Sequence, residues 1–135
     1  VVDALINSKK RAAEEMDISF TYDICLPETL SIEVIDLCVL YGNALDNAVE
    51  ACAKIVNGPK RIMMTAKYDN NSIVTKIENT IEPGTGSSLT TKKADRKNHG
   101  FGIGNIESAL MRYKNIHRIA VKDDIFSLSV VIFEQ

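Results

Sequence analysis

A long apolar segment, residues 32–56, constrains the fold more than any other part of the sequence. Wound as a helix at about 100° per residue, it is apolar over most of its surface, with a thin polar stripe on the opposite side. A helix with so little polar surface has to be buried against other elements. Ser31 is a suitable N-cap, and the Asn-Gly-Pro sequence at 57–59 ends the helix. The apolar line comprises Val34, Cys38, Tyr41, Leu45, Ala48 and Cys52, and the polar stripe comprises Asp36, Asn43, Asn47, Glu50 and Lys54.

Segments with the alternating or β-branched pattern of strands lie on both sides of this helix. Two of them flank the Asp-Asn-Asn sequence at 69–71, and two flank Asp123 and Asp124, so each pair predicts a β-hairpin. The predicted strands cover 18–24, 61–68, 72–79, 118–124 and 126–133, and the predicted helices cover 2–16, 32–56 and 104–113. This order predicts an α+β fold, a two-layer sandwich with three helices on one face of a mixed, mostly antiparallel sheet of about five strands.

Composition excludes several classes of function. The net charge of −2 argues against nucleic acid as a partner, because binding to a phosphate backbone needs a clustered basic surface. No apolar run approaches the roughly 20 residues that span a bilayer, so the chain is not expected to insert into a membrane. Cys25, Cys38 and Cys52 form no Cys-x-x-Cys pair and are expected to be reduced thiols in the cytoplasm. His99 and His117 have no partners at ligand spacing, so a zinc site is not expected.

Two asparagines, Asn43 and Asn47, lie one turn apart on the polar stripe. Asparagine is a poorer helix former than Lys, Glu, Gln or Arg, so its use here needs a reason. An amide offers an oxygen that can ligate a hard cation and an NH₂ that can donate to a phosphate. Alternatively, the two asparagines belong to an ordinary buried helix and bond a neighbouring loop. The helix alone leaves both interpretations open.

A polar segment, residues 80–102, leads into three glycines spaced two apart, Gly100, Gly102 and Gly104, directly before a predicted helix. Glycine frees backbone amides, and a helix N-terminus attracts anions through its unpaired N–H groups and its dipole. The spacing matches neither the dinucleotide-binding fingerprint nor the P-loop. A flexible hinge explains the glycines equally well. Four cations precede them and could reach a triphosphate or simply be solvated: Lys92, Lys93, Arg96 and Lys97.

Three segments in order, "LYGNALDNAVEAC", "KIENTI" and "HGFGIGNI", resemble the signature boxes of the GHKL ATPase superfamily. Within it, "SIEVIDLCVLYGNALDNAVEAC" is most similar to sensor histidine kinases of the peptide-pheromone, or quorum-sensing, group. The resemblance implies the Bergerat ATP-binding fold, with ATP and Mg²⁺ as cofactors.

The resemblance also implies roles for individual residues. Asn47 matches the asparagine that holds Mg²⁺. Asn43 matches the position where ATP-hydrolysing members carry a glutamate base. Because an amide cannot act as a base, transfer of the γ-phosphoryl to a histidine is expected instead of attack by water. Asn79 matches the aspartate that receives the adenine amino group, but the Asp-Gly-x-Gly signature is replaced by "NTIEPG"; a turn residue at a strand end is the alternative.

The segment "HGFGIGNI" matches the second glycine box of the superfamily, which forms the hinge of a loop called the ATP lid. The resemblance therefore implies the remaining site residues. The expected ATP-binding residues are Asn43, Asn47, Glu50, Asn79, Gly100, Phe101, Gly102, Ile103, Gly104 and Asn105, with Lys92, Lys93, Arg96 and Lys97 as lid cations.

The resemblance divides the chain into residues 1–16, the end of a dimerisation or linker helix, and residues 17–135, the catalytic domain. It implies two partners: the histidine-bearing dimerisation domain of the same parent protein, absent from this chain, and a response regulator. The domain is expected in the cytoplasm, on a parent anchored in the plasma membrane. Two alternatives stay open: a degenerate interaction module that does not bind nucleotide, and a serine-protein kinase of the anti-sigma type.

Overall fold

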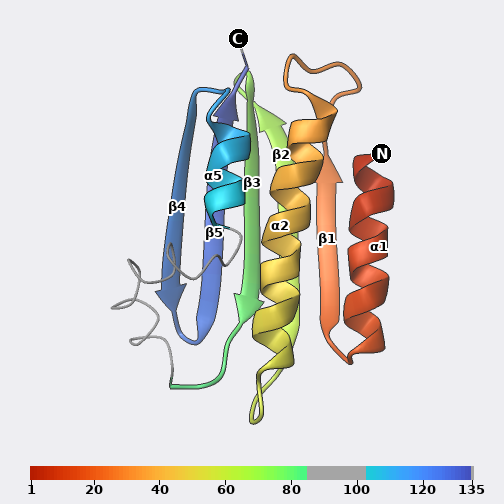
Figure 1. The fold of residues 1–135 in the computed structure, drawn as a ribbon, viewed down its shortest axis with the longest axis vertical. Coiled ribbons are helices and arrows are strands. Elements are labelled where there is room, and N and C mark those ends of the chain that lie inside the picture. The colour runs from red at the N-terminus through yellow and green to blue at the C-terminus, as the bar shows by residue number, and fades with distance from the viewer. Residues whose placement is uncertain (85–102, 135) are drawn as a thin grey trace.

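The computed structural model describes residues 1–84 and 103–134, which form two layers (Figure 1). One layer is a five-stranded sheet and the other consists of helices. In chain order the elements are α1 (Val2–Glu15), β1 (Ser19–Cys25), α2 (Val34–Ala53), β2 (Arg61–Asp69), β3 (Ser72–Thr80), α5 (Ile103–Leu110), β4 (Asn115–Lys122) and β5 (Ile125–Phe133). The predicted α+β two-layer sandwich is therefore confirmed.

The sheet has the strand order β1-β2-β3-β5-β4. The β1–β2 pair is parallel and the other three pairs are antiparallel, as the prediction of a mixed, mostly antiparallel sheet requires. Asn70 and Asn71 between β2 and β3 have positive φ, as do Asp123 and Asp124 between β4 and β5. Two-residue hairpin turns with positive φ match the twist of the flanking strands, and Asn and Asp tolerate this conformation better than most residues. Both predicted hairpins are confirmed.

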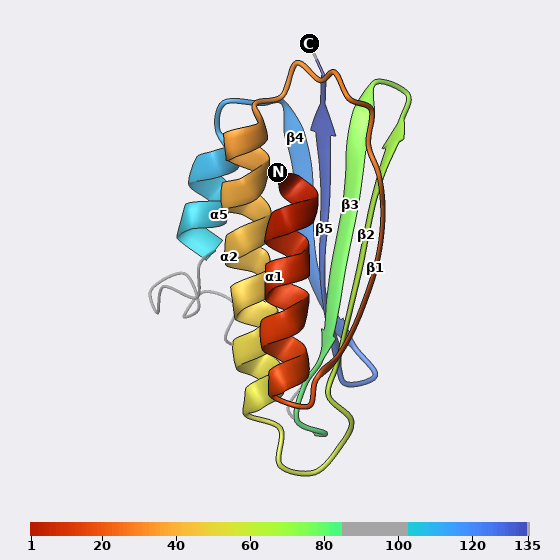
Figure 2. The same ribbon diagram turned by 90° about the vertical axis from the view of Figure 1, so that its right-hand side faces the viewer.

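All three helices of the described residues cover the same face of the sheet (Figure 2). The core between the layers takes one face of each inner strand, because side chains alternate along a strand. The helix α1 is part of this core through Ile6 and Ala13, and it is tied to α2 by an ion pair between Lys9 and Asp46 of 2.6 Å. The core residues of α2 are Leu37, Leu40, Tyr41, Ala44, Leu45, Ala48 and Cys52.

The helix α2 is shorter than predicted and starts differently. Ser31 is not the N-cap: the N-cap is Glu33, whose side chain makes no capping bond, while the Ser31 amide donates to the Glu134 carboxylate at 2.5 Å. Ser31 does not cap the helix because α2 begins at Val34, three residues further on, and Ser31 bonds Glu134 instead. Val34, placed on the apolar line, is 46% exposed, since it lies in the first turn at the edge of the layer. The rest of that line is at least half buried.

Tyr41 of α2 donates or accepts a hydrogen bond of 2.8 Å with Thr75 of β3, and both side chains are buried. Burial raises the pKa of Tyr41 to about 12, partly offset by the bond to Thr75, whereas an exposed tyrosine titrates near 10. Above pH 10 the unfolded chain loses this proton and the folded chain keeps it up to about pH 12. The contribution of this group is therefore complete below pH 10 and lost as the pH rises through 12.

We expect the free energy of unfolding to fall by roughly 2 to 3 kcal/mol between pH 10 and pH 12 on account of Tyr41. Urea denaturation across this range measures the fall. In the Tyr41→Phe variant the fall should be smaller by that amount, because the two proteins differ only in this hydroxyl group. Equal slopes in wild type and variant would contradict the assignment.

Candidate functional site

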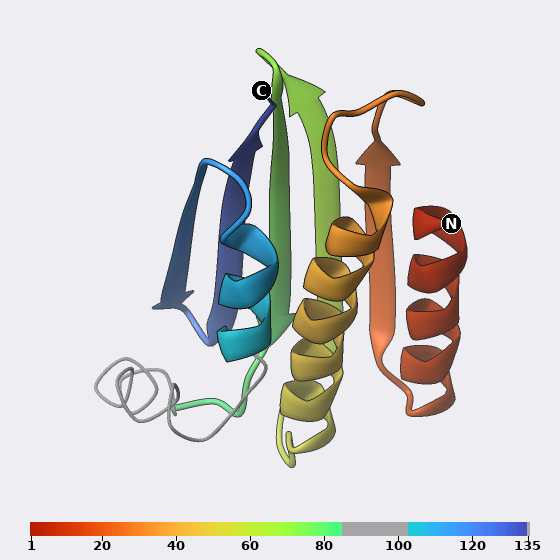
Figure 3. The same ribbon diagram turned by 45° about the horizontal axis from the view of Figure 1, so that its top comes forward.

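The helices α2 and α5 lie antiparallel, so that the start of α5 faces the middle of α2 (Figure 3). Their relative position follows from one end, where Arg112 and Tyr113, just after α5, contact Asp36 in the first turn of α2. From Arg112 back to Ile103 the chain spans about 13 Å at helical rise. The same length along α2, counted from Asp36, ends near Leu45. The N-terminus of α5 is therefore level with the turn of α2 that carries the two asparagines.

Asn43 and Asn47 are both half-buried on α2. The Asn43 Nδ2 donates to the Val39 carbonyl of its own helix at 2.7 Å, which leaves its amide oxygen available. Asn47 makes no side-chain hydrogen bond to any described residue. Within residues 1–84 and 103–134, neither amide bonds a neighbouring segment, so this part of the chain gives Asn47 no structural partner.

The other members of the predicted stripe do not share one environment. Asp36, with a side chain 14% exposed, turns towards the end of α5 and does not line the open part of α2. Glu50 and Lys54 are exposed near the C-terminus of α2. The stripe is divided because α5 is short and covers only the first half of this face. Glu50 remains on the uncovered half, with Asn47.

Asn79 lies on the helix-facing side of β3 and is only 3% exposed. Its Nδ2 donates to the Thr80 carbonyl at 3.0 Å. A carbonyl can only accept, so this bond directs the NH₂ to Thr80 and leaves Oδ1 for another donor. No described residue donates to that oxygen. A buried acceptor without a donor costs about 1–3 kcal/mol, so Asn79 is suited to receive one from a ligand.

Cys52 shows which part of α2 lies above Asn79. Its thiol approaches both the carbonyl and the hydroxyl of Thr80 at 3.7 Å, so the C-terminal half of α2 packs over the end of β3. Asn47 and Asn79 thus belong to the same end of the molecule. Burial raises the pKa of the Cys52 thiol, although its hydrogen bonds to Thr80 and to the Arg61 carbonyl lower it, so the thiolate that a nucleophile needs is disfavoured there.

The segment after β3 is held firmly, which the sequence did not reveal. Ile81 and Gly84 donate their amides to Asp124, at 3.0 Å to its carbonyl and 3.1 Å to its carboxylate. The Glu82 carboxylate accepts the amides of Val56 and Asn57, just past α2. The end of β3 is therefore ordered, although "NTIEPG" replaces the Asp-Gly-x-Gly signature there. In the sequence, only the carboxylate of Glu82 itself could have indicated this contact.

Several predicted site residues lie outside the described part of the chain: Gly100, Phe101, Gly102, Lys92, Lys93, Arg96 and Lys97. Ile103, Gly104 and Asn105 form the first turn of α5. The first amides of a helix have no acceptor within it, and they carry the positive end of the helix dipole. Because this end is level with Asn43 and Asn47, the amides of α5 could donate to an anion there, while the amide oxygens of α2 are suited to a cation bound beside it.

No group of three His, Cys, Asp or Glu side chains in the described residues could hold a metal ion. Mg²⁺, however, keeps several waters and is commonly held by one or two protein oxygens together with substrate phosphates. Amide oxygens, such as those of Asn43 and Asn47, are ligands of the kind that Mg²⁺ accepts. Among the helices that the structure describes, none has the length and apolar character to cross a membrane.

A family model described as "GHKL domain" matches residues 32–133. The fold is similar to the catalytic domain of histidine kinase ThkA, with a TM-score of 0.68 at 13% identity over 98% of this chain and 92% of that one. It is also similar to the histidine kinase AdeS of Acinetobacter baumannii (TM-score 0.68, 13% identity, 99% of this chain and 65% of that one). A third similar structure is the mycobacterial sensor histidine kinase MprB (TM-score 0.64, 13% identity, 99% and 97%). A comparison with curated proteins finds no significant match. Identities this low establish the fold alone.

Proposed function

The chain belongs to the GHKL domain family, and from that premise we propose that it is the ATP-binding catalytic domain of a sensor histidine kinase. The proposal is that it binds Mg²⁺–ATP and passes the γ-phosphoryl group to a histidine on another domain. The observation that carries it is the position of Asn47: half-buried, without a structural partner among the described residues, and level with the N-terminus of α5. The peptide-pheromone group stays a prediction from the sequence.

The residues present fit the proposed cofactors. Asn47, assisted by Asn43, would hold the metal through amide oxygens, and the first amides of α5 would donate to phosphate oxygens. Asn79 would accept a hydrogen bond from the adenine amino group through its unused oxygen. Glu50, on the part of α2 that α5 does not cover, is proposed to contact ATP at the edge of the site. Gly100, Phe101 and Gly102 with the lid cations stay predictions.

The proposed reaction depends on positioning. When bound, Mg²⁺ would neutralise charge that develops on the phosphoryl oxygens. The α5 amides would act in the same direction from a fixed place, at no cost of reorganisation. Asn43 carries an amide, which cannot take a proton from water, so the site favours transfer to an external nucleophile.

The proposed nucleophile is a histidine outside this chain. His117 is poorly placed for the role because both of its ring nitrogens face partners: Asn115 Oδ1 lies 2.8 Å from Nδ1, and the Glu107 carboxylate lies 3.7 Å from Nε2. It also stands on a strand, whereas the proposed acceptor belongs to a dimerisation helix. His99 lies outside the described residues.

The domain organisation is also a proposal. Residues 1–16 would be the end of a dimerisation or linker helix, and its packing through Ile6 and Ala13 would fix the orientation of that helix on the catalytic domain, residues 17–135. The proposed partners are the dimerisation domain of the parent protein and a response regulator. The proposed location is the cytoplasm, on a membrane-anchored parent.

The chain is expected to bind ATP in the presence of Mg²⁺ and not to label itself with phosphate. Calorimetry with ADP and Mg²⁺ tests the binding, and incubation with radiolabelled ATP followed by acid and alkali treatment tests for phosphohistidine. Robust self-labelling would contradict the proposal. Absence of heat and of a thermal shift at millimolar nucleotide would favour the degenerate interaction module. Acid-stable phosphate on an added protein substrate would favour the serine-protein kinase.

A further inference from the structure

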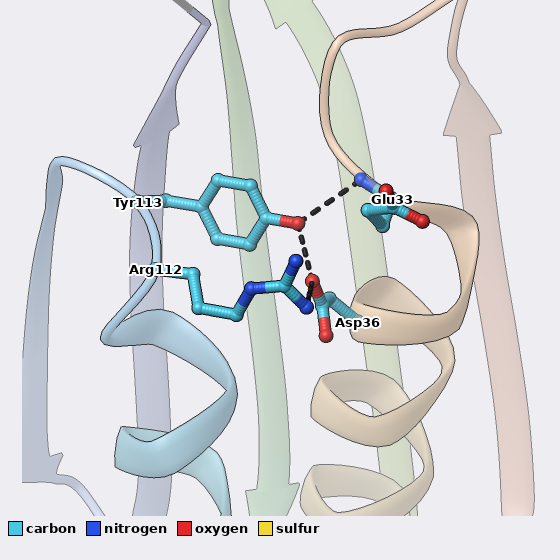
Figure 4. Close-up of polar contacts among 4 residues, drawn as sticks. All are labelled: Glu33, Asp36, Arg112 and Tyr113. Carbon is cyan, nitrogen blue, oxygen red and sulfur yellow. Dashed lines mark hydrogen bonds and ion pairs between the residues drawn. The ribbon is translucent and has the colours of Figure 1, made fainter.

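A cluster of four residues joins the end of α5 to the start of α2 (Figure 4). The Glu33 amide donates to the Tyr113 hydroxyl at 3.1 Å, and that hydroxyl donates in turn to the Asp36 carboxylate. The Arg112 guanidinium donates to the same carboxylate oxygen at 3.2 Å. We call Glu33, Asp36, Arg112 and Tyr113 the α2–α5 cluster.

The cluster provides a helix cap from a distant part of the chain. The N-cap residue, Glu33, makes no side-chain capping bond, so the first turn of α2 lacks the local cap that most helices use. The Tyr113 hydroxyl, 80 residues away in sequence, replaces this local cap by accepting a hydrogen bond from the Glu33 amide. The negative charge of Asp36, in the first turn, also stabilises the helix, because it lies at the positive end of the helix dipole.

Asp36 is the centre of the cluster. Its side chain is 14% exposed and accepts from both Tyr113 and Arg112, whereas the Arg112 side chain is 63% exposed. Burial and the bond to Asp36 raise the pKa of Tyr113, while the Glu33 amide lowers it, so the hydroxyl keeps the proton that it donates. Two donors from the segment after α5 thus meet one acceptor on α2, and both bonds are directional.

Apolar packing also holds α5, through Ile106, Ala109 and Leu110. Apolar contacts are non-directional, so they set the distance of a short helix from its neighbours better than its position along its own axis. Hydrogen bonds at one end fix that position. The only such bonds between α5 or its adjoining turn and α2 in the described residues are those of the α2–α5 cluster.

We propose that Asp36 is a positioning residue for phosphate binding: by fixing the C-terminal end of α5, it sets where the N-terminal amides of α5 stand relative to Asn43 and Asn47. This inference rests on the proposed function. The cluster lies about 13 Å from the start of α5. A tilt of about 5° at the cluster moves that start by about 1 Å, and misplacement by 1 Å can cost as much as 100-fold in a positioned reaction.

The two ends of the ligand would respond differently to a change at Asp36. The adenine would bind at Asn79 on β3, which the cluster does not touch, whereas the phosphates would bind against α5. The Asp36→Asn variant is therefore expected to lower the affinity for Mg²⁺–ATP about 10-fold and to change the affinity for adenosine less than twofold. Calorimetry on the 135-residue chain measures both dissociation constants, at a temperature where urea titration shows each variant to be folded.

Asp46→Asn is the matched control, because Asp46 is on the same helix and its ion pair with Lys9 faces α1. It should change neither affinity. Tyr113→Phe keeps the aromatic packing, removes the hydroxyl, and should reproduce the loss for Mg²⁺–ATP even if Asp36→Asn fails to fold. Equal losses for ATP and adenosine, or a loss of stability with both affinities unchanged, would overturn the inference. If the wild-type chain bound neither ligand, the proposed function itself would fail.

Discussion

Replacement of Asn47 by alanine is expected to lower the affinity for Mg²⁺–ATP at least about 100-fold, while the free energy of unfolding stays constant or rises. Loss of residues that merely orient a metal ligand costs about 10- to 100-fold, so loss of the ligand itself should cost at least the upper figure. The Asn47 side chain makes no hydrogen bond to the described residues that alanine would remove. Alanine also favours the helix by roughly 0.5 kcal/mol over asparagine.

Nucleotide affinity and stability are thus expected to change in opposite directions in this variant. A residue kept for packing loses stability when it is truncated, whereas one kept for a ligand loses binding and often gains stability. Calorimetry with and without Mg²⁺ measures the first quantity, and urea denaturation without nucleotide measures the second. The affinity for adenosine, which carries no phosphate, should not change.

Asn7→Ala is the matched control, since Asn7 is the asparagine of α1 and accepts a hydrogen bond of 2.6 Å from Tyr22. It should lose up to about 1 kcal/mol of stability and leave nucleotide binding unchanged. If Asn47→Ala instead behaves like this control, Asn47 has a structural role, and the proposed magnesium site would have to be abandoned.

The sequence predicted the architecture well because the features that specify it are local. Alternation along each strand sets which side chains face the helices, and this pattern is complete within a few residues. The hairpin turns are equally local: two consecutive residues that tolerate positive φ, Asn70 with Asn71 and Asp123 with Asp124, are sufficient. The apolar face of α2 follows from helical periodicity in the same way.

The start of α2 could not be predicted because its partners are distant in sequence. Ser31 has the side chain of an N-cap, but its amide is taken by Glu134, and the cap of the helix comes from Tyr113. No local pattern identifies either contact. For the same reason, periodicity placed Asp36 and Asn47 on one stripe, and only the length and position of α5 separate them.

The candidate site was predictable in part. Asn43 and Asn47 on one helical face, and a helix beginning after the glycines, could be inferred from spacing. The position of α5 against α2, which brings these features level, depends on the α2–α5 cluster and is tertiary. Likewise the sequence indicated Asn79 only through a resemblance, and its burial with an unused oxygen is a property of the folded chain.

Asn79 is expected to decide which base the domain accepts. The wild-type domain is expected to prefer ATP over inosine triphosphate by about 100-fold, and Asn79→Leu is expected to abolish that preference. Adenine presents an amino group where inosine presents a carbonyl oxygen. The bond from Nδ2 to Thr80 leaves an acceptor at the proposed adenine position, and two acceptors facing each other in a buried site leave both unsatisfied.

The leucine variant tests this cleanly because it is of similar size and removes a polar group that is unsatisfied without ligand. The Thr80 carbonyl loses the bond from Asn79 but still receives the Cys52 thiol, so the nucleotide-free variant should be nearly as stable as wild type. Competition between ATP and inosine triphosphate against a fluorescent nucleotide measures the preference in both proteins. An unchanged preference in Asn79→Leu would mean that another residue recognises the base, and that Asn79 serves only to end β3.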